Sequence, residues 1–201
     1  MPKLQKTIKP RSRASIRDTG VVTKSSSLKG KRLAIALTGG IACTEAVKII
    51  REFRRHGATL TPFMTSDSLR FITALSIEWA AAEKAVIEVG PGVDTLDQFD
   101  AVIVAPATLN SIVKASLGIA DSAVNLLIAG QIGKKAPLFF VPTMNEDLMN
   151  HPQYSVAKEV LIKWGAQFFE QALEENRLKM PDAIQVADWV MKELKNVRKR
   201  N

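Results

Sequence analysis

The chain has 201 residues, of which 46% are hydrophobic and 24% are charged, a balance typical of a globular protein with a sizeable core. Its net charge of +8 is uneven, because residues 1–30 hold eight Lys or Arg and one Asp (+7), which leaves about +1 (8 − 7) for the rest. This distribution argues against a strongly basic folded surface, so we expect no nucleic-acid partner.

The first segment, residues 1–29, is polar, basic and without periodicity, and it closes with three consecutive serines. Such a composition offers little apolar surface to offset the entropy of ordering. We therefore predict a disordered leader over residues 1–29 and one folded domain over 30–201. A transit peptide is the weaker alternative for the leader.

A short apolar run over residues 32–37 predicts a first buried strand, and a glycine turn follows it. Residues 42–56 then have the spacing of an amphipathic helix, which Gly57 ends. Glycines allow close approach and positive φ, and a helix N-terminus binds phosphate. The glycine turn at residues 38–41 is thus a candidate phosphate site, although the third glycine of the dinucleotide fingerprint is absent.

A second strand is predicted over residues 59–64, followed by hydroxyl residues and a helix that reaches Phe71. Another helix is expected to begin at Thr73, and residues 85–89 favour a short strand. A third buried strand is predicted from Ala101 to Ala105, where Pro106 should stop it because proline has no N–H for a ladder. Small and polar residues come next, at the strand end where open α/β sheets bind ligands.

The remaining pattern alternates helix and strand. Helices are predicted over residues 122–130, 154–164 and 183–197, and strands over 137–141 and 166–169, with a polar loop over 170–181. Strands that alternate with helices predict a parallel sheet covered by helices on both faces.

The single cysteine, Cys43, allows no disulfide framework and no cysteine-based metal site within one chain. Its position in an apolar helix favours a small buried hydrophobe. No apolar run approaches the roughly 18 residues that span a bilayer. We expect a cytoplasmic protein with no metal and no membrane partner.

Four motifs together resemble the flavin-containing cysteine decarboxylase family, which includes phosphopantothenoylcysteine decarboxylase and lantibiotic peptide decarboxylases. They occur in the family's order over about residues 30–190. The motifs are Thr38-Gly-Gly-Ile-Ala42; Met64-Thr65 with Phe71-Ile-Thr73; Ala105-Pro-Ala-Thr108 with Asn110 and Gly118-Ile-Ala-Asp121; and Pro142-Thr-Met-Asn145 with Met149. The resemblance implies a flavodoxin-like (Rossmann-like) three-layer α/β sandwich with a parallel sheet, bound FMN, and a homo-oligomer that is a trimer or a multiple of three, often a dodecamer. It also implies that the synthetase domain fused to many bacterial members is missing here.

The resemblance also implies site residues. Those carried over to FMN are Gly39, Gly40, Ile41, Thr65, Ser66, Ser68, Phe71, Thr108, Leu109, Asn110 and Ser111. Asn145 matches the catalytic asparagine that holds the substrate carboxylate, so the expected partner is a small-molecule carboxylate or cysteine-derived substrate. Met144 is placed beside it, and Arg177 and Lys179 could hold an anion, although a solvated charged loop is the alternative.

Two family residues have no counterpart. The family's histidine should precede the central strand, around residues 92–99, but the two histidines are His56 and His151. The substrate loop carries a cysteine in the pantothenate-pathway enzymes, whereas residues 172–181 contain none. Three hypotheses follow: a decarboxylase with a rearranged site, an FMN-dependent oxidoreductase or electron carrier, and a non-enzymatic regulatory relative. A flavin prenyltransferase is less favoured, because that branch's Gly-Ala-Ser-Gly turn is absent.

Overall fold

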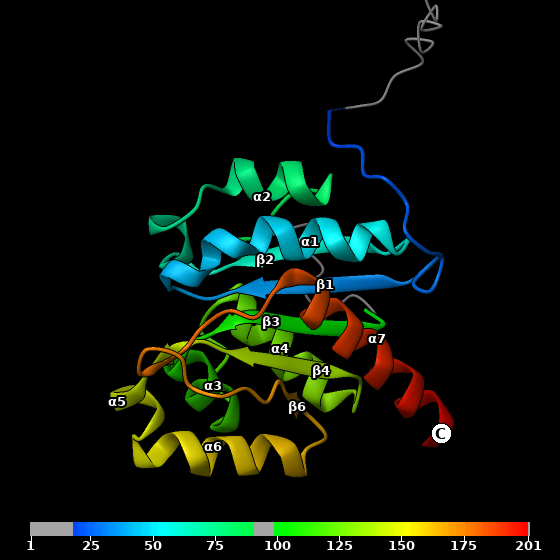
Figure 1. The fold of residues 1–201 in the computed structure, drawn as a ribbon. Coiled ribbons are helices and arrows are strands. Elements are labelled where there is room, and N and C mark those ends of the chain that lie inside the picture. Colours follow the sequence, from blue (N-terminus) through cyan, green and yellow to red (C-terminus); the bar gives the residue numbers. More distant parts are fainter. Residues whose placement is uncertain (1–17, 91–98, 201) are drawn as a thin grey trace, which may run out of the picture.

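A computed structural model describes residues 18–90 and 99–200, and Figure 1 shows their arrangement. Its centre is a five-stranded parallel sheet with the strand order β2-β1-β3-β4-β6. The strands are β1 (Arg32–Leu37), β2 (Thr59–Met64), β3 (Ala101–Ala107), β4 (Leu138–Pro142) and β6 (Gln167–Phe168). The predicted flavodoxin-like α/β fold is confirmed.

Helices cover both faces of the sheet (Figure 1). On one face lie α1 (Ala46–Arg55), α2 (Ala74–Ala81) and α7 (Ala183–Arg200), and on the other α3 (Leu109–Ser116), α4 (Ala123–Gly133) and α6 (Pro152–Lys163). Strand side chains alternate between the two cores, as Ile35 and Ile103 face α1 while Ala34 and Val102 face α4. The short elements are η1 (Ile41–Glu45), η2 (Ser68–Arg70), β5 (Met144–Asn145), α5 (Glu146–Met149) and β7 (Arg177–Leu178).

Strand β3 is longer than predicted, because Pro106 does not end it. The pairing between β3 and β4 shifts register between Val104 and Ala107. Pro106 lies within this irregular stretch, where the strand does not need the backbone N–H that proline lacks.

Two other predicted boundaries change. The strand expected over residues 85–89 is a single bridge from Val86 to Phe63. The polar loop expected over 170–181 contains β7, which pairs antiparallel with β5. Neither could be predicted from periodicity, because elements of one or two residues have none.

The second half of the predicted disordered leader packs against the domain. Residues 1–17 lie outside the described part, but residues 18–29 contact the domain. Leu28 is buried, the backbone N–H of Lys24 donates to Arg55, and the Lys24 ammonium lies 2.6 Å from the carboxylate of Glu52. Trp79 donates a hydrogen bond to Asp18 at 2.8 Å. The folded unit therefore begins before residue 30, because a buried carboxylate on α1 finds its cation there.

Candidate functional site

The carboxyl ends of β1 and β3 are joined by hydroxyl groups. Thr38, which is fully buried after β1, donates to the Pro106 carbonyl at 2.8 Å and accepts from the Thr108 backbone N–H at 3.0 Å. The Thr108 hydroxyl in turn lies 3.3 Å from that of Ser111. This chain of bonds fixes the start of α3 against the glycine turn, where the predicted cofactor contacts lie.

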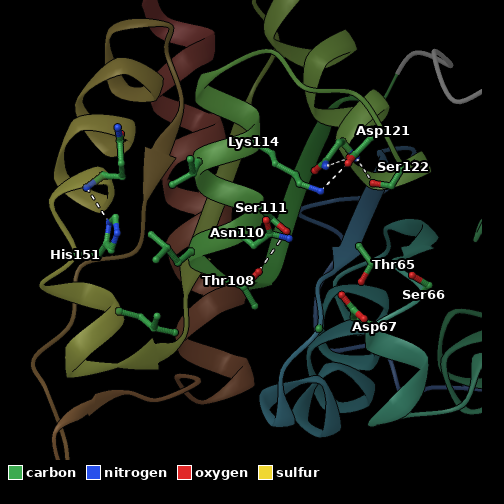
Figure 2. Close-up of a pocket in the computed structure, with 16 residues that line it drawn as sticks. Thr65, Ser66, Asp67, Thr108, Asn110, Ser111, Lys114, Asp121, Ser122 and His151 are labelled. Carbon is green, nitrogen blue, oxygen red and sulfur yellow. Dashed lines mark hydrogen bonds and ion pairs between the residues drawn. The ribbon is translucent and has the colours of Figure 1, made fainter.

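Two adjoining hollows open at this edge of the sheet, one of about 650 Å³ and one of about 690 Å³. They share Gly39, Thr108, Leu109 and Leu148. The first extends over Thr65, Ser66 and α3 (Figure 2). The second extends over η1, β5 and β7. Each volume is within the range of small-molecule and cofactor sites.

The structure brings together most residues predicted for the site. The first hollow is lined by Gly39, Thr65, Ser66, Thr108, Leu109, Asn110 and Ser111. The second is lined by Gly39, Gly40, Ile41, Thr108, Leu109, Met144, Asn145, Arg177 and Lys179. The glycine turn and the turn after β3 thus face one composite cavity, as two neighbouring strand ends should.

Ser68 and Phe71 line neither hollow. The buried Ser68 hydroxyl donates to the Thr65 carbonyl at 2.7 Å, and its backbone N–H donates to the Thr65 hydroxyl at 3.2 Å. Ser68 therefore holds the shape of the turn that presents Thr65. Phe71 follows η2 and is 43% exposed.

Several lining residues were not predicted: Glu45, Asp67, Lys114, Asp121, Ser122, Asn125, His151 and Gln153. Lys114 lies 2.6 Å from Asp121, and Asn125 donates to the same carboxylate at 2.8 Å. These bonds, that of Lys114 first, lower the pKa of Asp121. One helical turn separates Lys114 from Ser111, so the helical period of α3 was the available signal.

His151 lies in the wall of the first hollow (Figure 2). Its Nδ1 accepts a hydrogen bond from the Gln153 backbone N–H at 3.1 Å, so it caps α6. This bond leaves the proton of the neutral ring on Nε2. The stretch where the family's histidine would fall, around residues 92–99, is largely outside the described residues.

Cys43 is buried on η1 and its thiol donates to the Thr38 carbonyl at 3.1 Å. Burial raises the pKa of the thiol to about 11. The side chain is therefore buried as predicted, and its raised pKa disfavours the thiolate form.

The glycine turn fits a phosphorylated ligand. A Cβ at Gly40 would meet only Thr108, at 3.8 Å, so the backbone is open to close approach there. The neighbouring η1 leads directly into α1, and N–H groups at a helix start are free to bind oxyanions. Gly40 has a φ of −167°, however, so it serves by lacking a side chain rather than by a left-handed turn.

Other site types find no support among the described residues. Within 18–90 and 99–200, His, Cys, Asp and Glu form no cluster that could hold a metal ion. In the same part of the chain, no helix is long and apolar enough to cross a membrane.

The sheet order, the two helical layers and a cavity at the strand ends define an α/β protein of the flavodoxin-like class. A match to the Flavoprotein family model covers residues 21–195, so the chain belongs to that family. The predicted resemblance to a flavoprotein family is confirmed.

Curated relatives of this chain are bifunctional coenzyme A biosynthesis proteins named CoaBC. The protein from Thermococcus kodakarensis is 30% identical over 179 residues, which cover 86% of this chain and 44% of that protein. The Methanocaldococcus jannaschii protein is 29% identical over 181 residues, covering 89% of this chain and 44% of that protein. The chain thus spans less than half the length of these relatives.

Solved structures share the fold. MrsD from a Bacillus species has a TM-score of 0.74 at 20% identity, covering 84% of this chain and 99% of its own. The peptidyl-cysteine decarboxylase EpiD has a TM-score of 0.71 at 21% identity, covering 80% and 98%. A PPC decarboxylase variant complexed with pantothenoylaminoethenethiol has a TM-score of 0.70 at 18% identity, covering 82% and 98%.

Proposed function

We propose that this protein binds FMN in the composite cavity and presents it to a small carboxylate or cysteine-derived substrate. The observation that carries the proposal is the meeting of the glycine turn with Thr108–Ser111 at one edge of the sheet, with Asn145 on the adjoining wall. FMN supplies oxidation or reduction of a bound carbon when it is present.

The chain's own residues have separate tasks in this proposal. Gly39 to Ile41 give backbone N–H groups to the phosphate, and Thr65, Ser66 and the turn after β3 surround the sugar-alcohol chain and ring. Asn145 donates its amide N–H groups to the substrate carboxylate. With FMN bound and the substrate oxidised, a carboxylate held by Asn145 could leave as carbon dioxide.

Two tests follow in sequence. The visible spectrum of the purified protein, and titration of the flavin-free protein with FMN and FAD, test the cofactor. We expect tight binding of FMN over FAD, because one glycine turn serves one phosphate. A protein that purifies colourless and takes up no FMN would contradict the assignment.

An FMN-dependent oxidoreductase or electron carrier is the second candidate, and a regulatory relative without activity is the third. The observation that favours both is the sequence of residues 172–181, which lacks a cysteine. Reduction of the bound flavin by a nicotinamide or ferredoxin donor without release of carbon dioxide would select the second. Retained flavin with neither activity would select the third.

A further inference from the structure

We infer that Arg177 and Asn145 together form a carboxylate receptor, and that Arg177, rather than Lys179, makes the second hollow selective for an anionic ligand. The inference rests on the proposed function in taking this hollow as the substrate side. It adds a residue that determines substrate charge.

The Asn145 side chain is oriented by the helix that follows it. Its Oδ1 accepts a hydrogen bond from the Leu148 backbone N–H at 3.2 Å, which makes Asn145 the N-cap of α5. The amide oxygen faces the start of the helix, and the side-chain NH₂ group is the part of Asn145 that can donate to a ligand. Asn145 itself is exposed and lines the hollow. An NH₂ group can only donate, so this wall asks for an acceptor.

Arg177 is brought beside it by strand pairing. Asn145 and Arg177 are direct partners across the antiparallel β5–β7 pair, and the Glu146 backbone N–H donates to the Asn176 carbonyl at 2.9 Å. Direct partners point to the same face, with Cβ atoms about 4.5–5.5 Å apart. The segment that carries β7, orange in Figure 1, runs from β6 back toward α5 before it enters α7.

The two cations on this segment, Arg177 and Lys179, differ in the partners that they already have within the protein. Lys179 lies 2.9 Å from Glu175 and 3.6 Å from Glu174, so its charge is largely compensated. Within the described residues, the Arg177 guanidinium makes one hydrogen bond, from Nε to the Glu175 carbonyl at 3.5 Å. The direct bond from Lys179 is the largest cause that lowers the pKa of the Glu175 carboxyl, and the charge of Arg177 lowers it by less. The two terminal nitrogens of Arg177 remain for a ligand. Glu45, the acidic residue among those lining the hollow, is paired with Lys48 at 2.7 Å.

The combined chemistry points to a carboxylate. A planar guanidinium offers two parallel N–H groups that match the two oxygens of a carboxylate, and the Asn145 amide adds a third donor. A neutral amide or ester in the same place would leave donors unpaired. The ligand class is therefore a small carboxylic acid, bound as its anion.

The test compares two probes of equal shape and different charge. N-acetylcysteine and N-acetylcysteine amide are titrated into the protein by calorimetry, at two salt concentrations. We expect the acid to bind at least about tenfold more tightly than the amide. Arg177→Gln should weaken binding of the acid by about tenfold to a hundredfold and leave the amide unchanged. Lys179→Gln, two residues away on the same segment, should change either affinity by less than about threefold.

Several outcomes would overturn the inference. Equal loss in the Lys179 and Arg177 variants would mean a diffuse charge effect, and unchanged binding in Arg177→Gln would remove the residue from the site. Inorganic phosphate competing as well as acetate would show a general oxyanion site. Arg177→Lys, which keeps the charge and loses the fork, should lie between wild type and Arg177→Gln. Melting temperatures verify that each variant is folded.

The proposed function can fail independently. The titrations are run with and without FMN, because Arg177 and Asn145 are held by the chain and not by the cofactor. A protein that takes no FMN but still selects the acid through Arg177 keeps the receptor and loses the cofactor assignment. A protein that binds FMN but binds the acid and the amide equally keeps the cofactor assignment and loses the receptor.

Discussion

Gly39 lies against Asp67 so closely that a Cβ atom at Gly39 would be 2.4 Å from the Cβ of Asp67. The turn after β1 and the turn after β2 therefore touch at the floor of the first hollow. A side chain at Gly39 would push the Thr65–Ser68 turn away from the cavity. The need for glycine here is close packing between two strand ends.

This contact predicts a difference between two adjacent glycines. Gly39→Ala should lower the free energy of unfolding by about 1–3 kcal/mol and weaken FMN binding, because over-packing moves backbone. Gly40→Ala should cost less than about 1 kcal/mol, since its φ of −167° suits any residue and its nearest neighbour would be 3.8 Å away. Urea unfolding and FMN titration measure both. Equal losses of unfolding free energy in the two variants would contradict the packing argument, and Gly39→Ala combined with Asp67→Gly should recover part of that loss. FMN affinity is compared separately, because a methyl group at either glycine would narrow the approach of a ligand to the backbone.

The sequence was sufficient for the parallel sheet and most of the cavity, because both follow from strong local signals. The run over residues 32–37 is β1 with the same bounds, and the turn after β3 lines the cavity as expected. Contacts between distant segments were not predictable. The pairing of β5 with β7 and the approach of Asp67 to Gly39 depend on tertiary packing, which leaves no periodic mark in the chain.

Residues 18–29 provide a second prediction, through Glu52. Burial raises the pKa of this carboxyl, but hydrogen bonds from Lys24 and Arg55 outweigh it, so the net pKa is lowered. A lowered pKa in the folded state stabilises the fold above the unfolded pKa of about 4.3, and the gain is lost as pH falls through the folded value. Glu52→Gln should therefore cost about 1–3 kcal/mol at pH 7 and progressively less in acid.

Chemical unfolding of wild type and Glu52→Gln between about pH 7 and pH 3 measures this effect. A chain that begins at residue 18 should have the same melting temperature as the full chain. One that begins at residue 30 should have a lower melting temperature, because it lacks Leu28 and Lys24. Glu45→Gln is a matched control, since that carboxylate is exposed and paired with Lys48 at the surface. A difference between wild type and Glu52→Gln that is constant with pH would refute the linkage.

Exposed apolar side chains carry a third prediction. Ile41 is 70% exposed, Leu75 is 75% and Leu117 is 66%. Large exposed apolar side chains are candidates for contacts between subunits where they gather into a patch. We predict a trimer or a multiple of three, as the family resemblance implies. Light scattering should give that mass at micromolar concentration, and Leu117→Lys should reduce it more than Val22→Lys, which is 81% exposed on the N-terminal segment. A monomeric wild-type protein would rule the assembly out.

The last prediction concerns turnover of 4′-phosphopantothenoylcysteine, the substrate class that the resemblance suggests. We expect conversion to phosphopantetheine to be very slow or absent, although Asn145 and the turn after β3 line the cavity. The segment 172–181 offers no thiol, and Cys43 is buried with a pKa of about 11, so neither supplies the proton that completes reduction. Removal of a positioned acid or base typically slows a reaction by about 10²–10⁴.

Carbon dioxide release and product mass separate the outcomes. Carbon dioxide with an enethiol product would show that the first half survives, and Leu173→Cys would then be expected to raise the yield of the reduced product. Full conversion at about 1 s⁻¹ or more, within the usual enzyme range, would show that another group donates the proton, and His151 in the cavity wall would be the first residue to replace.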